Sequence, residues 1–247
     1  MTTSNPTLGA FNNVGALGAS YGDSATMTVD GTIHKTGILA VLLALAFGFT
    51  WVGLTHAEAP PAVPIILGLF GGFILAMIIC FKPTTAPFLS PAYALAEGFF
   101  LASISYYFEQ LYPLIALQAA TMTIATVFGM LIAYRTGLIK VNNTFRAVIV
   151  GATMTIALYY LVGMIAMFFG VLLPGIGFQG GMFSILISGV IVIVAAMNLA
   201  LDFDQIASCA GTAPRYMEWY GAFGLMVTIV WLYISILRLL ANSRNRN

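Results

Sequence analysis

Two carboxylates near the end of the sequence, Asp202 and Asp204, are the residues best suited to do chemistry. They lie at the foot of a long apolar run, because residues 182–200 contain no ionisable side chain. A charge placed in hydrocarbon costs several kcal/mol unless it is paired, hydrated or protonated. An acid in this position is therefore a candidate cation ligand, proton acceptor or gating group.

Two further carboxylates, Glu97 and Glu218, are expected near the same end of the molecule. Glu97 lies about 9 Å into the third apolar run, and Glu218 opens the last one. For Glu97 and Asp202 we expect a functional role. Asp204 and Glu218 also fit a simpler interpretation as interfacial helix ends, and Glu218 is expected at a helix N-terminus, where negative charge is favoured. Burial and a neighbouring like charge both favour the neutral form of a carboxyl group, so an acid pair here is expected to act as a pH switch.

Basic residues supply natural counter-ions for these acids. Lys82 and Arg215 are expected at the same end as the four carboxylates. The sequence has no clustered metal-ligand spacing, and we expect no metal site and no bound cofactor. His34 and His56 lie outside the apolar runs, and no Gly-x-Gly-Asp motif indicates an aspartyl intramembrane protease. We therefore expect no enzymatic activity.

The elements that must position these residues are membrane-spanning helices. The chain has 247 residues, of which 60% are hydrophobic and only 7% charged, whereas soluble domains carry about 25% charged residues. A helix needs about 20 apolar residues to cross the hydrocarbon core. Seven runs qualify, at about 36–54, 62–81, 91–110, 114–134, 147–171, 181–204 and 218–241. The sequence predicts an all-α membrane protein, a seven-helix transmembrane bundle.

The domain organisation and orientation follow from polar composition and from charge. Residues 1–34 are predicted to form a flexible tail, followed by a transmembrane domain over residues 35–247. The net charge of +1 gives no indication of nucleic acid as a partner. The expected partner of so apolar a chain is the lipid bilayer. Basic residues collect in the tail and in the loops on its side: Lys35, Lys82, Arg135, Lys140, Arg146 and Arg215. Because cytoplasmic loops carry the excess of Lys and Arg, the N-terminus is predicted to be cytoplasmic.

The order and spacing of several segments resemble the Bax inhibitor-1 (YccA-type) family, and most closely a bacterial branch of it. The segments are Met27–Thr36, Ala96–Gly98, Leu201–Ile206 and Met217–Tyr220. The resemblance covers residues 27–241. It implies a seven-helix fold with the last helix central, in the inner (plasma) membrane of a bacterium. For some members it also implies a calcium-permeable, pH-sensitive leak.

The resemblance also implies roles for single residues. In channel-like members two aspartates on the sixth and seventh helices sense pH. Asp202 matches the first, whereas the second falls near Thr228, which cannot ionise. Lys82 corresponds to the family's basic partner at the end of the second helix. Arg238 corresponds to its arginine near the end of the seventh helix, whose acidic partner is absent here.

Two functions follow from these expectations. The first is a pH-sensitive cation leak, with calcium as the transported ion and an inner cluster of oxygen ligands from Asp202, Asp204, Glu97 and Glu218. Because Thr228 cannot ionise, Glu97 or Glu218 is the alternative source of the second acid of a pH-sensing pair with Asp202. The other is a non-transporting regulator in a stress response, which binds a membrane protease or another partner through its helices and tail.

Overall fold

The computed structural model describes residues 26–56, 62–170 and 181–245. Within these ranges seven helices are long and apolar enough to cross a membrane. The elements are α2 (Val29–His56), α3 (Ala62–Phe81), the short 3-10 helix η1 (Pro83–Thr85), α4 (Ala86–Leu111), α5 (Ile115–Arg135), α6 (Asn143–Phe168), α7 (Met182–Cys209) and α8 (Met217–Arg244). The chain is therefore an all-α, multi-pass membrane protein, as predicted.

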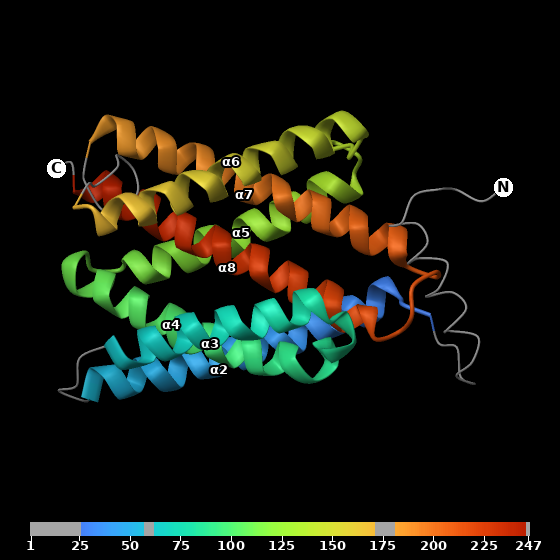
Figure 1. Cartoon of the computed structure of the whole chain (residues 1–247), viewed down its shortest axis with the longest axis horizontal. Helices are drawn as coiled ribbons and strands as arrows, with labels where there is room; N and C mark the ends of the chain where they lie inside the picture. The colour runs from blue at the N-terminus through green and yellow to red at the C-terminus, as the bar shows by residue number, and fades with distance from the viewer. Residues whose placement is uncertain (1–25, 57–61, 171–180, 246–247) are drawn as a thin grey trace.

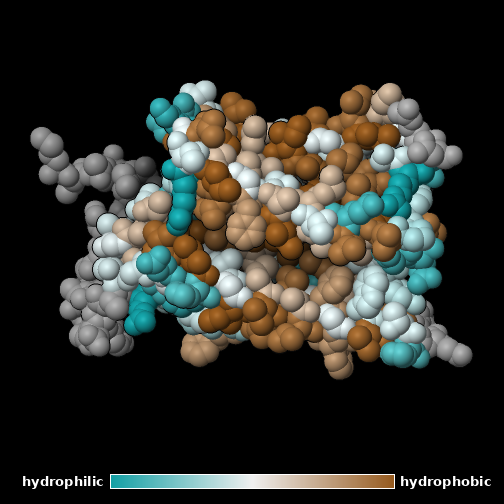
Figure 2. Space-filling view, turned by 180° about the vertical axis from the view of Figure 1, so that it is seen from behind, coloured by the Kyte–Doolittle hydropathy of each residue, from teal (hydrophilic) through white to brown (hydrophobic). Residues whose placement is uncertain are grey.

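Consecutive helices run in alternating directions along the long axis of the molecule (Figure 1). Helices α2, α4, α6 and α8 begin at one end, which we call the N-terminal end of the bundle, and α3, α5 and α7 finish there. In Figure 2, apolar side chains cover most of the middle of the visible face, and hydrophilic side chains lie mainly towards the two ends. This distribution fits helices that cross a bilayer along the long axis.

Helix α8 is the central element of the bundle. It packs against α2, α4, α5 and α7, whereas α3 packs mainly on α4, and α6 packs on α7. Of the residues in the most apolar stretch of each helix, 56% are buried in α8, but only 17% in α3 and 11% in α6. The last helix is thus enclosed by its neighbours, and α3 and α6 present most of their apolar side chains to lipid.

The first helix begins earlier than the sequence analysis expects. Helix α2 starts at Val29 and not at residue 36, so part of the expected tail is helical. Thr28 explains the start, because its hydroxyl accepts a hydrogen bond from the backbone N–H of Gly31 at 2.9 Å, as a helix N-cap does. Asp30 adds a favourable negative charge in the first turn. Residues 1–25 of the expected tail lie outside the described residues.

The sixth span is longer than expected, which changes the position of its two acids. Helix α7 continues to Cys209, although the apolar run was expected to finish at residue 204. Asp202 is therefore seven residues before the helix end, about 10 Å along the axis. Both acids lie inside the helix, and neither terminates it.

Candidate functional site

Asp202 borders a partly open cavity in the N-terminal half of the bundle, and the lining of this cavity includes the exposed residues Cys80, Gln205 and Val227. The cavity has a volume of about 320 Å³ and is lined by residues of α3, α7 and α8. Its walls are mostly apolar or aromatic, and include Ala76, Cys80, Ile206, Tyr220 and Phe223. Among the lining residues, Asp202 supplies a carboxylate and Gln205 supplies a side-chain amide. The site is thus a largely apolar space with one carboxylate exposed to it.

The Asp202 carboxylate is incompletely partnered. Its Oδ2 atom is buried and has no hydrogen-bond partner among the described residues. The hydroxyl of Thr228 on α8 interacts with this carboxylate. That hydroxyl has a single proton, which the Asp202 carboxylate shares with the carbonyl of Gly224 at 3.3 Å. The structure therefore places Thr228 beside Asp202, where the family resemblance expects a second aspartate, and a buried carboxylate oxygen remains available for a ligand.

Asp204 faces another part of the bundle. Two residues along a helix correspond to a rotation of about 200°, so adjacent acids on α7 point in different directions. Asp204 accepts a hydrogen bond from Arg146 on α6 at 2.8 Å and one from Tyr134 on α5 at 3.3 Å. Its side chain is 28% exposed and that of Arg146 is 50% exposed. The structure gives Asp204 a counter-ion, Arg146, that the sequence analysis did not single out for it.

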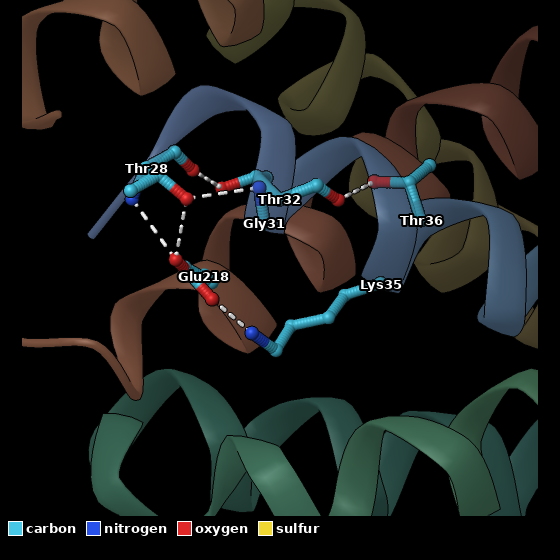
Figure 3. Close-up of polar contacts among 6 residues, drawn as sticks. All are labelled: Thr28, Gly31, Thr32, Lys35, Thr36 and Glu218. Carbon is cyan, nitrogen blue, oxygen red and sulfur yellow. Dashed lines mark hydrogen bonds and ion pairs between the residues drawn. The ribbon is translucent and has the colours of Figure 1, made fainter. Parts of the chain in front are cut away.

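Glu218 lies at the start of α8 and is bound to the beginning of α2 (Figure 3). Its Oε1 atom accepts hydrogen bonds from the backbone N–H and the hydroxyl of Thr28, each at 2.9 Å. Its Oε2 atom forms an ion pair with Lys35, whose ammonium group also lies 5.7 Å from the centre of the Trp219 ring. The Glu218 side chain is only 3% exposed. Glu218 thus opens a helix, as expected, but its carboxylate is buried and bound to the start of α2.

The expected counter-ions of Glu218 also need correction. Lys35, and not Lys82 or Arg215, is its ion-pair partner. The sequence carries a signal for this contact, since the segments Met27–Thr36 and Met217–Tyr220 each stand out as a motif. Their pairing cannot be recognised without the fold, because about 190 residues separate them in sequence.

Glu97 occupies a separate position between α3 and α4. It interacts with the hydroxyl of Tyr93, one turn earlier on α4. A Cβ atom added at Gly72 of α3 would lie 2.8 Å from Glu97 Oε1, so the carboxylate sits where the absence of a side chain leaves room. The Tyr93 ring in turn packs edge-on against the Phe223 ring, with the two ring centres 4.9 Å apart. Glu97 is thus held within the α3–α4 pair.

Among the described residues, the remaining expected bases form no salt bridge with these acids. Lys82 is exposed after the end of α3. Arg215 is exposed and lines a pocket of about 410 Å³ that also contains Lys35 and Glu218. Arg238 donates to the Tyr160 hydroxyl at 2.6 Å, and its guanidinium lies over that ring at 5.1 Å. Arg238 therefore joins α8 to α6 through an aromatic residue and not through an acid.

The expected cluster of four acids does not form a set of metal ligands. Among the residues the structure describes, no three His, Cys, Asp or Glu side chains are placed to hold a metal ion together. Asp202, Asp204, Glu97 and Glu218 each have a different set of neighbours, on different faces of the helices. Helical periodicity fixes their depth from sequence, but the direction in which each points depends on helix rotation and packing.

Comparison with known proteins gives one match. A family model described as Bax inhibitor 1 like matches residues 5–245. No curated protein and no solved structure matches the chain. The match spans all seven helices, including the segments that form the Asp202 cavity and the Glu218 contacts.

Proposed function

Because the chain belongs to the Bax inhibitor 1 like family, we propose that it is a pH-sensitive leak pathway for cations, with calcium as the transported ion. The observation that carries this proposal is the Asp202 carboxylate, which faces a cavity and has a buried oxygen without a partner. A negatively charged oxygen is the ligand that calcium prefers. The cavity volume of about 320 Å³ is large enough for several water molecules at about 30 Å³ each.

The sparse set of ligands favours transient passage over tight binding. Calcium takes six to eight oxygen ligands, and tight sites supply most of them from protein. Around Asp202 the protein offers one carboxylate, the Thr228 hydroxyl and the Gln205 amide, so water must supply the rest. Conduction requires a site that attracts the ion but releases it again. A single carboxylate in a hydrated cavity meets that requirement.

The pH sensitivity is assigned to Asp202 itself. Protonation removes its charge and with it the attraction for a cation. Thr228 cannot ionise, so the proton equilibrium belongs to one carboxyl group and not to a coupled pair of acids. We therefore propose a simple one-proton dependence of the flux, and not the two-step dependence of a pair of facing aspartates.

We further propose that the protein lies in the inner (plasma) membrane of a bacterium, with the N-terminal end of the bundle towards the cytoplasm. Six basic residues that the structure places at or near this end support the orientation: Lys35, Lys82, Arg135, Lys140, Arg146 and Arg215. The excess of Lys and Arg on the cytoplasmic side is the general rule for such proteins. A reporter fused after Asn247 tests it, and activity of that reporter on the cytoplasmic side contradicts the orientation.

Reconstitution tests the transport proposal. The purified chain is placed in liposomes that contain a calcium-sensitive dye, and calcium is added outside. We expect faster dye response than in protein-free liposomes, with a rate that depends on pH. A response equal to that of protein-free liposomes overturns the leak proposal. In that case the alternative function remains, a non-transporting regulator of a membrane protease. Capture of a partner from native membranes then tests this alternative. We assign the chain no catalytic activity.

A further inference from the structure

A short extended segment, Thr26–Thr28, separates two cavities at the N-terminal end of the bundle. Thr26 and Thr28 line the outer pocket of about 410 Å³, which also contains Glu218 and several exposed side chains. Met27 lines the inner cavity that contains Asp202. Alternate residues of an extended chain point to opposite sides, so these three residues form a wall with one face towards each space.

The Met27 side chain fills the wall on the inner side. It is only 2% exposed. Its Cε atom is 3.4 Å from the position of a Cβ added at Gly221 on α8, so it packs directly against that helix. An apolar side chain in this position disfavours water and ions within the wall between the outer pocket and the Asp202 cavity.

The backbone of the segment is attached to the loop that connects α7 and α8. The N–H of Met27 donates to the carbonyl of Ala213 at 2.8 Å, and the carbonyl of Met27 accepts from the N–H of Gly211 at 2.8 Å. Thr26 also forms an isolated antiparallel bridge with Pro214. These contacts are few and do not extend into a sheet among the described residues. A segment with so few bonds can be released without unfolding the helices.

Glu218 adds the strongest attachment. One oxygen accepts hydrogen bonds from both the N–H and the hydroxyl of Thr28, and the other oxygen pairs with Lys35 in the second turn of α2 (Figure 3). A Cβ atom added at Gly31 would collide with this carboxylate, so the helix carries no side chain at the position where Glu218 lies. Hydrogen bonds to a charged acceptor are stronger than those between neutral groups.

We propose that the segment Thr26–Thr28 is a releasable seal between the outer pocket and the Asp202 cavity, and that Glu218 is the latch that holds it closed. The proposal concerns access to the cavity, and it rests on the proposed function only for its consequence, faster cation flux when the seal is released. A test of access alone therefore separates the two proposals.

The test measures how fast a water-soluble maleimide reaches the inner cavity. The probe is a thiol introduced by Gly224→Cys after Cys80 and Cys209 are replaced by Ala. Gly224 lines the cavity, and a Cβ added there meets nothing within 4 Å. The full chain is studied in lipid nanodiscs, where both membrane faces are accessible.

Two variants release the latch by different routes. Glu218→Gln removes the charge, whereas Gly31→Ala keeps the carboxylate but displaces it. Each is expected to raise the labelling rate about tenfold, which corresponds to about 1.4 kcal/mol in the opening equilibrium. The matched control is Gly37→Ala in the same helix, where an added Cβ meets nothing within 4 Å. A second control, Glu109→Gln, removes a carboxylate that accepts hydrogen bonds from Leu114 and Ala116 at the other end of the bundle.

The outcomes separate clearly. Faster labelling in both latch variants, with both controls unchanged, supports the seal. Labelling at the parent rate in folded Glu218→Gln and Gly31→Ala protein overturns it, whether or not the chain transports cations. If Glu218→Gln does not give folded protein, Gly31→Ala decides, because it retains every ionisable group. If labelling rises while liposome flux stays at the level without protein, the seal stands and the leak proposal fails.

Discussion

Glu218 and Asp202 are two carboxylates near the same end of the bundle, but their surroundings are opposite. Glu218 has three donors from two residues of the polar segment around the start of α2, and its side chain is 3% exposed. Asp202 has a neighbouring threonine, an apolar cavity and a buried oxygen without a partner. A buried acceptor without a partner carries a desolvation cost, which a bound cation, proton or water can relieve. The comparison therefore assigns a fastening role to Glu218 and a ligand or proton role to Asp202.

The largest loss of stability is expected when Glu218 loses its base. Lys35→Met leaves the carboxylate bound only to Thr28. Because the site borders the outer pocket and is not deep in the core, we expect a loss of about 2 kcal/mol, as for a hydrogen bond to a charged group. Unfolding in micelles with increasing dodecyl sulfate measures it. Lys140→Met removes an exposed lysine as a control. Equal midpoints for the two variants would show that Glu218 does not fasten α2 to α8.

A smaller loss is expected from Gly31→Ala. Alanine normally stabilises a helix interior by up to about 1 kcal/mol relative to glycine. At Gly31 the added methyl group meets the Glu218 carboxylate and must displace it from Thr28 and Lys35. We expect a net loss of about 1 kcal/mol, whereas Gly37→Ala should be neutral or stabilising. The same unfolding assay measures both, and a stabilised Gly31→Ala variant would contradict the contact.

Asp204→Asn should have a weaker effect, because its ion pair with Arg146 is partly exposed to solvent. Such pairs contribute about 0–1 kcal/mol and are screened by salt. We expect a loss in this range that shrinks when the ionic strength is raised. A loss as large as that of Lys35→Met, independent of salt, would place Asp204 in the same class as Glu218.

The smallest effect on stability is expected for Asp202→Asn. This change keeps the shape of the side chain, removes no ion-pair partner and relieves the cost of burying a charge, so the free energy of unfolding should not fall by more than about 0.5 kcal/mol. A loss comparable to that of Lys35→Met would mean that Asp202 is fastened as Glu218 is. That result would contradict the difference between Asp202 and Glu218, on which the ligand or proton role of Asp202 depends.

The sequence predicts the helices well because hydrophobic length is a local property. The third and fourth spans, for example, were expected to separate near residues 110–114, and α4 and α5 meet there. Boundaries fail where polar residues extend a helix beyond its apolar run. Thr28 caps α2 before the expected start, and α7 continues through Asp202 and Asp204 to Cys209.

The partners of the acids could not be predicted to the same degree. Asp202 was singled out, and Thr228 was expected near it through the family resemblance. From the sequence, Arg146 and Lys35 indicate orientation but not their acidic partners, because a partner on another helix depends on how the helices rotate and pack. The segment around Met27 stands out in the sequence as a motif. Its position between two cavities becomes visible only when the loop from α7 to α8 is placed against it.

The pH dependence of calcium flux through Asp202→Asn protein in liposomes tests the central claim most directly. Burial can shift the pKa of a carboxyl group by several units. The flux should therefore be measured from about pH 5 to about pH 9. We predict a flux that changes with pH in the parent protein, with a one-proton profile, and a flux that is reduced and independent of pH in Asp202→Asn. An Asp202→Asn protein that retains the parent flux and its pH dependence would contradict the account.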